Sequence, residues 1–158
     1  LWTYLAWVLC LQLLYVLINY LPTRFGLAAL VTGSGQSLLL SQAWPVFSYD
    51  GGELFAAIGA ALLAAGIGLA LWDPWRATNV VHPADRRWLD FRDAYGLAWG
   101  MRVAERVNQS AERFEWGVTL EWDGFHSAEE GAAPSEAAWN EADLGLRALL
   151  RRFVGKEW

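Results

Sequence analysis

Residues 54–72 read LFAAIGAALLAAGIGLALW, nineteen consecutive residues without a charge. At about 1.5 Å per residue, a helix of this length covers roughly the 30 Å of a bilayer's hydrocarbon core. The run leads into WDPWR at residues 72–76, where tryptophans, charges and a helix-stopping proline coincide. This stretch predicts a membrane-spanning helix, and it decides the expected fold class.

A second uncharged run, LWTYLAWVLCLQLLYVLINYL at residues 1–21, is also long enough to span a bilayer. A signal peptide is the alternative, but no basic segment precedes the apolar part, and Pro22, Thr23 and Arg24 follow it rather than a small-residue cleavage site. We therefore expect an anchored helix. Because Leu1 already lies inside this run, we also expect a processed product or part of a longer protein.

Charges are segregated along the chain. Only Arg24, Asp50 and Glu53 fall within residues 1–72, whereas the other 26 of the 29 charged residues follow, and 55% of the 158 residues are hydrophobic. Such a composition is too apolar for an ordinary soluble domain, and a single cysteine excludes a disulfide scaffold. We expect a mainly α-helical membrane protein with a membrane region at residues 1–76 and a small soluble α+β domain at residues 77–158.

The segment between the two expected spans, residues 25–49, carries no charge. The glycines around Ser34 predict a break in its middle, which leaves the halves 25–31 and 37–43 too short to cross a bilayer. An interfacial or re-entrant segment is therefore favoured over a third span. The Gly-Ser-Gly sequence lacks the further residues of a phosphate-binding loop.

Basic residues near the membrane predict the orientation. One, Arg24, lies between the spans, whereas four follow the second span (Arg76, Arg86, Arg87 and Arg92). The positive-inside rule then predicts a cytoplasmic C-terminal domain. The N-terminus is cytoplasmic as well if there are two spans, and outside if residues 25–49 cross. Eleven of the 12 basic residues are arginine, a usage typical of GC-rich bacterial genomes, so we expect a bacterial inner membrane.

Small residues recur every four positions in the second span, at Ala56, Ala60, Ala64 and Gly68. A helix face without large side chains permits close helix packing, so these residues are predicted to form an assembly interface. Gly59 and Gly66 form a second small stripe; a transport path there is the alternative, although no intramembrane charge marks one. Four tryptophans are predicted to anchor the membrane interface: Trp2, Trp44, Trp72 and Trp75.

The polar half predicts a helix, one strand and a second helix. Apolar residues at helical spacing indicate a helix from a cap at Asp85 to about residue 111 or 114, and another from Ser135 to about Gly155. Alternation over residues 116–122 predicts a strand that ends at residues 123–124. An isolated strand needs a partner, which could be an unrecognised strand of this chain, for example within residues 77–81, the same strand in a second copy of the chain, or another subunit.

Signals for chemistry are weak. The only histidines, His82 and His126, are 44 residues apart and no cysteine lies beside them, so neither a metal nor a cofactor is expected. Asp123, His126 and Ser127 lie close together in the sequence, but no nucleophile motif surrounds them. The basic residues alternate with acids, and the net charge is −5, so no nucleic-acid partner is expected.

The hypothesis favoured by these patterns is a non-catalytic membrane subunit that docks to other membrane proteins or to itself. A tryptophan-rich surface formed by Trp116, Trp122 and Trp139 is a predicted partner surface, because such rings exceed the needs of a small core. One alternative is a transporter subunit in which residues 25–49 form a re-entrant segment. Another is a membrane-bound enzyme that uses Asp123 and His126.

Overall fold

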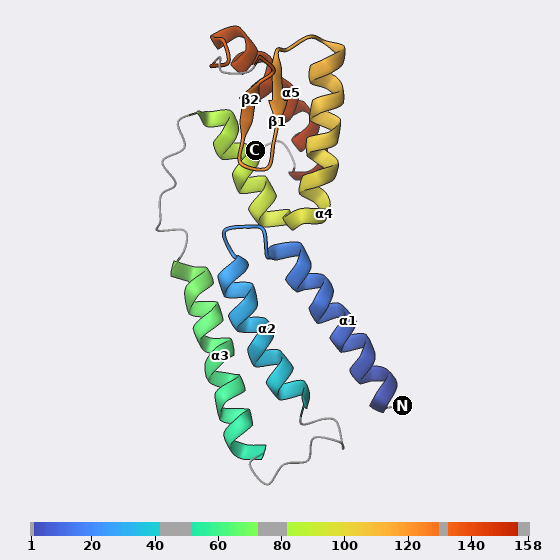
Figure 1. Cartoon of the computed structure of the whole chain (residues 1–158), viewed down its shortest axis with the longest axis vertical. Coiled ribbons are helices and arrows are strands. Elements are labelled where there is room, and N and C mark those ends of the chain that lie inside the picture. Colours follow the sequence, from blue (N-terminus) through green and yellow to red (C-terminus); the bar gives the residue numbers. More distant parts are fainter. Residues whose placement is uncertain (1, 42–51, 73–81, 130–132, 155–158) are drawn as a thin grey trace. The chain divides into compact units, whose positions relative to one another are not determined.

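A computed structural model describes residues 2–41, 52–72, 82–129 and 133–154 (Figure 1). About 80% of the described residues are helical, and the chain divides into two compact units, Leu1–Ala77 and Thr78–Trp158. Each unit is described by itself.

The first unit contains three helices: α1 (Trp2–Tyr20), α2 (Gly26–Ser41) and α3 (Gly52–Trp72). By length and composition α3 could cross a membrane. Within α1, the apolar helix is Trp7–Tyr20, which is shorter than this criterion requires. Of the two expected spans, α3 therefore meets this criterion.

The predicted break at Gly33-Ser34-Gly35 is wrong, because α2 runs without interruption through it. Its glycines allow close helix packing instead. A Cβ atom built on Gly33 would lie 2.7 Å from a methyl carbon of Leu17 in α1. The Ser34 and Ser37 hydroxyls donate to carbonyl oxygens one turn back, on Leu30 and Gly33, so their polarity is satisfied within the helix. Residues 42–49 of the expected re-entrant segment lie outside the described residues.

The second unit consists of α4 (Pro83–Arg113), β1 (Val118–Leu120), β2 (Phe125–Ser127) and α5 (Glu136–Val154). The helix cap is His82 rather than the expected Asp85, since His82 Nδ1 accepts a hydrogen bond from the Ala84 amide at 3.2 Å. α4 also bends at Gly96, whose φ of 75° is outside the helical region.

The expected helix–strand–helix order is wrong because the strand forms a hairpin with β2. The strands pair antiparallel, with Leu120 opposite Phe125, and the Glu121 amide donates to the Gly124 carbonyl across the turn. The Asn108 side chain of α4 exchanges two hydrogen bonds with the Leu120 backbone, at 2.7 and 3.0 Å. The strand that pairs with β1 therefore belongs to this chain, and so does the Asn108 side chain that bonds to the β1 backbone. Residues 77–81, the alternative partner strand, lie outside the described residues.

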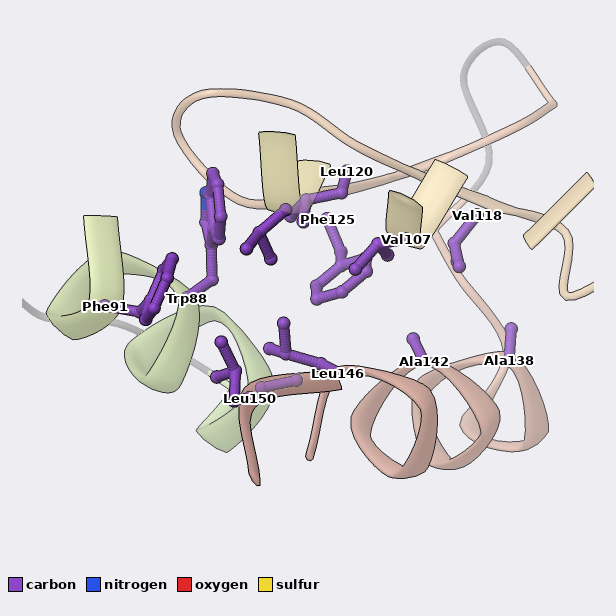
Figure 2. Close-up of a cluster of buried hydrophobic side chains, with 12 residues drawn as sticks. Trp88, Phe91, Val107, Val118, Leu120, Phe125, Ala138, Ala142, Leu146 and Leu150 are labelled. Atoms are coloured by element: carbon purple, nitrogen blue, oxygen red, sulfur yellow. The ribbon is translucent and has the colours of Figure 1, made fainter. Parts of the chain in front are cut away.

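The core of the second unit lies between the hairpin and the two helices (Figure 2). The side chains of Trp88, Phe91, Val107 and Leu146 are fully buried. Trp88 Nε1 donates to the Trp122 carbonyl oxygen at 3.3 Å, so this buried indole keeps a hydrogen bond. The core explains the apolar periodicity of both helices.

Candidate functional site

The described surface of the first unit is apolar on all three helices. Leu11 in α1 is 64% exposed, Leu27 in α2 63% and Leu71 in α3 69%. Only 11% of the apolar window of α3 is buried, whereas the core helix of a soluble protein would be mostly buried. The unit therefore presents large apolar side chains outward.

The two helices α2 and α3 pack through the second small stripe, Gly59 and Gly66. A Cβ atom on Gly66 would lie 2.1 Å from Thr32 Oγ1, and one on Gly35 would lie 2.7 Å from the Gly59 carbonyl oxygen. Backbones this close require glycine on both helices.

The first stripe lies mainly on an exposed part of α3. Ala56 is half-buried, whereas Ala60, Ala64 and Gly68 are exposed, and a Cβ atom on Gly68 would meet nothing within 4 Å. This helix face remains accessible in the described unit.

Among the predicted interface anchors, Trp72 is 69% exposed at the end of α3. Trp44 and Trp75 lie outside the described residues, and so does the side chain of Trp2.

The three tryptophans of the predicted partner surface are partly buried and pack against the core of the second unit. Trp116 lies against α5, where a Cβ atom on Gly145 would be 2.1 Å from its ring. Trp122 meets Trp88 edge to face at 6.3 Å between ring centroids, and Trp139 stacks on His82 at 3.9 Å. Each ring therefore has neighbours within the unit.

The hairpin turn joins Asp123 and His126. His126 Nε2 and Asp123 Oδ1 are 2.9 Å apart, and both side chains are exposed. The hydrogen bond to Asp123 is the main cause that raises the pKa of His126, and the same bond lowers the pKa of Asp123. Glu121 and Asp85 also raise the pKa of the imidazole through their charges.

Asp85 holds this turn against α4. Its Oδ1 accepts a hydrogen bond from the Phe125 amide at 2.8 Å. Burial is the main cause that raises the pKa of this carboxyl group, while the bond to Phe125 lowers it. Gly124, at φ 146°, leaves no room for a side chain beside this carboxylate.

Glu121 lies beside this pair, a position that no sequence motif predicts. Donor atoms of Glu121, Asp123 and His126 all lie within 4.8 Å of one another, on three exposed residues. A cation could accept such ligands, but nothing beyond the cluster itself points to a bound ion.

Ser127 does not complete a catalytic triad with these groups. Its Oγ accepts a hydrogen bond from the Glu129 amide at 3.2 Å. As the next residue of β2 after His126, it also points to the opposite face of the strand. The arrangement therefore supplies a paired imidazole without an adjacent nucleophilic serine.

A groove of about 790 Å³ in the second unit brings together arginines that are scattered through the sequence: Arg102, Arg106, Arg113 and Arg152. This cluster is not among the sites predicted from the sequence. Its signal was the spacing of the first three, at positions i, i+4 and i+11, which places them on one helix face.

In the comparisons with known proteins, no family model, no curated protein and no solved structure matches this chain.

Proposed function

We propose that this chain is a non-catalytic integral membrane subunit that assembles with other membrane proteins or with copies of itself. The observation that carries the proposal is the outward apolar surface of the first unit. Transfer of such side chains from water into lipid is favourable, and α3 matches the thickness of a bilayer. In this proposal α1 is the second span and completes a membrane hairpin, and the second unit is cytoplasmic in a bacterial inner membrane.

Assembly is supported by the accessible small-residue face of α3. One small stripe, with Gly59 and Gly66, is already used against α2. The other, at Ala60, Ala64 and Gly68, would let a further helix approach closely. The exposed parts of Trp116, Trp122 and Trp139 would add contacts outside the membrane.

The other two functions have less support. The transporter hypothesis depended on a re-entrant segment at residues 25–49, and α2 is a continuous helix over most of it. The enzyme hypothesis needs Asp123 and His126 to act with groups on another chain, because Ser127 lies on the other face of its strand. We therefore favour the subunit.

The test is the mass and composition of the particle extracted from native membranes in mild detergent through a C-terminal tag. We expect a stoichiometric complex, formed with foreign membrane subunits or with copies of this chain. Substitution of both Ala60 and Ala64 by leucine should disrupt it, because two large side chains would separate the helices.

Ala65→Leu is the matched control. Ala65 is also exposed, but at 100° per residue it lies about 140° around the helix from Ala60. A chain that is recovered as a monomer, or that leaves the membrane in alkaline carbonate, would contradict the proposal.

A further inference from the structure

The groove between α4 and α5 collects positive charge in a chain whose net charge is −5. Its lining includes four exposed arginines, Arg102, Arg106 and Arg113 from α4 and Arg152 from α5. One carboxylate, that of Glu105, lies among them, and it accepts a hydrogen bond from Gln109 at 3.3 Å. The local balance therefore favours an anion.

Unlike three other arginines of this unit, the groove arginines form no ion pair within the described residues, a property that they share with the exposed Arg86 and Arg151. Arg87 and Arg147 both pair with Asp143, and Arg92 pairs with Asp93 at 2.7 Å. Within the described part of the chain, no carboxylate forms an ion pair with any of the four groove arginines. Their hydrogen-bond donors are thus available to a ligand.

Aromatic rings orient two of the guanidinium groups at the groove. The Cζ atom of Arg102 lies 5.3 Å from the ring centroid of Trp99, and that of Arg113 lies 5.7 Å from the centroid of Phe114. An arginine held over an aromatic face keeps its N–H groups free to bind in the plane of the guanidinium. The rings therefore restrict the side chains without neutralising them.

Helix electrostatics explain only part of this cluster. Arg113 ends α4 and Arg152 lies in the last turn of α5, where positive charge stabilises a helix end. Arg102 and Arg106 lie well before the last turn of α4, so the helix dipole gives no reason for their charge. Stabilisation of a helix end therefore accounts for Arg113 and Arg152 but not for Arg102 and Arg106.

We propose that this groove binds a phosphate group through Arg102, Arg106, Arg113 and Arg152. Phosphate suits the groove because guanidinium groups bind its oxygens in pairs, and a phosphomonoester carries about −1.5 to −2 charges near neutral pH. Leu149 also lines the groove and is partly exposed, so it offers an apolar surface to the remainder of the ligand. The phosphate could belong to a lipid headgroup or to a soluble compound. The site does not depend on the proposed subunit function.

The test measures binding to the full chain in a neutral detergent by titration calorimetry. Three probes are used: inorganic phosphate, short-chain phosphatidic acid and short-chain phosphatidylcholine. We expect phosphatidic acid to bind more tightly than phosphatidylcholine, and binding to weaken as salt is added. Inorganic phosphate binding as well would identify a soluble phosphate as a sufficient ligand, and binding of phosphatidic acid without it would identify the lipid headgroup.

The decisive variant is R102Q/R106Q, which should weaken binding roughly tenfold or more, because charge-assisted hydrogen bonds are lost. The matched control is R86Q/R151Q, which removes two exposed arginines outside the groove lining and should bind as the natural chain does. If R102Q/R106Q fails to fold, R102K/R106K preserves the charge and removes only the guanidinium geometry, so it should still weaken binding.

Three results would overturn the proposal. The first is that neither inorganic phosphate nor phosphatidic acid binds. The second is that phosphatidylcholine binds as tightly as phosphatidic acid. The third is that R86Q/R151Q weakens binding as much as R102Q/R106Q does.

Discussion

At the scale of single residues, position on a helix decides what a side chain contributes. Leu144 and Leu146 are two positions apart in α5, yet Leu144 is 62% exposed and Leu146 is 0% exposed. Leu146 packs in the core with Trp88 and Phe125 (Figure 2). The same residue type therefore has different energetic roles at these two positions.

We expect Leu146→Ala to lower the free energy of unfolding of the second unit by about 2–5 kcal/mol, because it removes buried surface and leaves a cavity. Leu144→Ala should change it by less than about 0.5 kcal/mol, as is usual for surface positions. Urea denaturation followed by near-ultraviolet circular dichroism measures both. Equal losses for the two variants would show that the core is not packed as described.

The hydrogen-bonded pair of Asp123 and His126 predicts how the stability of the hairpin depends on pH. The hydrogen bond to Asp123 raises the pKa of His126 above its ordinary value of 6.5. Because the folded pKa is raised, the pair stabilises the hairpin while His126 is protonated, and this contribution is lost as the pH rises through the raised pKa. It is also lost at acidic pH, as Asp123 becomes protonated through its lowered pKa.

Asp123→Asn should move the pKa of His126 back toward its ordinary value, as measured by an NMR titration of the imidazole. Glu129→Gln is the control, since Glu129 is not among the causes of the shift. An unchanged pKa in the Asp123 variant would rule out the pair as its main cause.

At the scale of elements, glycines determine which faces of α3 can pack. Gly66 contacts α2 so closely that a Cβ atom would meet both Thr32 Oγ1 and, at 2.9 Å, the Thr32 amide nitrogen, which is backbone. Gly68, two residues later, has open space around it. Gly66 is therefore required for helix packing, whereas Gly68 tolerates a side chain.

Gly66→Ala should destabilise the first unit by about 1–3 kcal/mol through overpacking. Gly68→Ala should be neutral or stabilise it by up to about 1 kcal/mol, because alanine is the better helix former. Thermal unfolding in detergent compares the two variants. A Gly66 variant as stable as the natural chain would contradict the close approach of α2 and α3.

The same contacts explain an error of the sequence analysis. Gly33 and Gly35 predict a break, because glycine weakens an isolated helix by its flexibility. In the folded unit they face Leu17 and Gly59, and the packing they permit outweighs their low helix propensity. Sequence spacing alone does not distinguish these two uses of glycine.

At the scale of the whole molecule, the two units place their apolar surface differently. The second unit buries Trp88, Phe91 and Leu146 in a core of its own, whereas the first exposes large apolar side chains on each helix. Residues 78–158 expressed alone should therefore be soluble without detergent and give the circular dichroism of a helical domain. Residues 1–77 should require detergent. Aggregation of the isolated second unit would show that its core is incomplete.

The sequence by itself determined the properties that depend on local pattern. The uncharged run at residues 54–72 predicts α3, which is long and apolar enough to span a membrane. The periodic apolar residues after Pro83 and after Ser135 predict α4 and α5, and alternation predicts β1, because each pattern reflects one buried face.

Only the tertiary structure decided which distant residues meet. β2 is three residues long, too short for its alternation to be recognised, and the hairpin that it forms with β1 is held by hydrogen bonds to Asp85 and Asn108 of α4. The groove arginines come from two helices that are separated in sequence. Such contacts depend on how the helices pack around a shared core, and that information is distributed over the whole unit rather than written in any one segment.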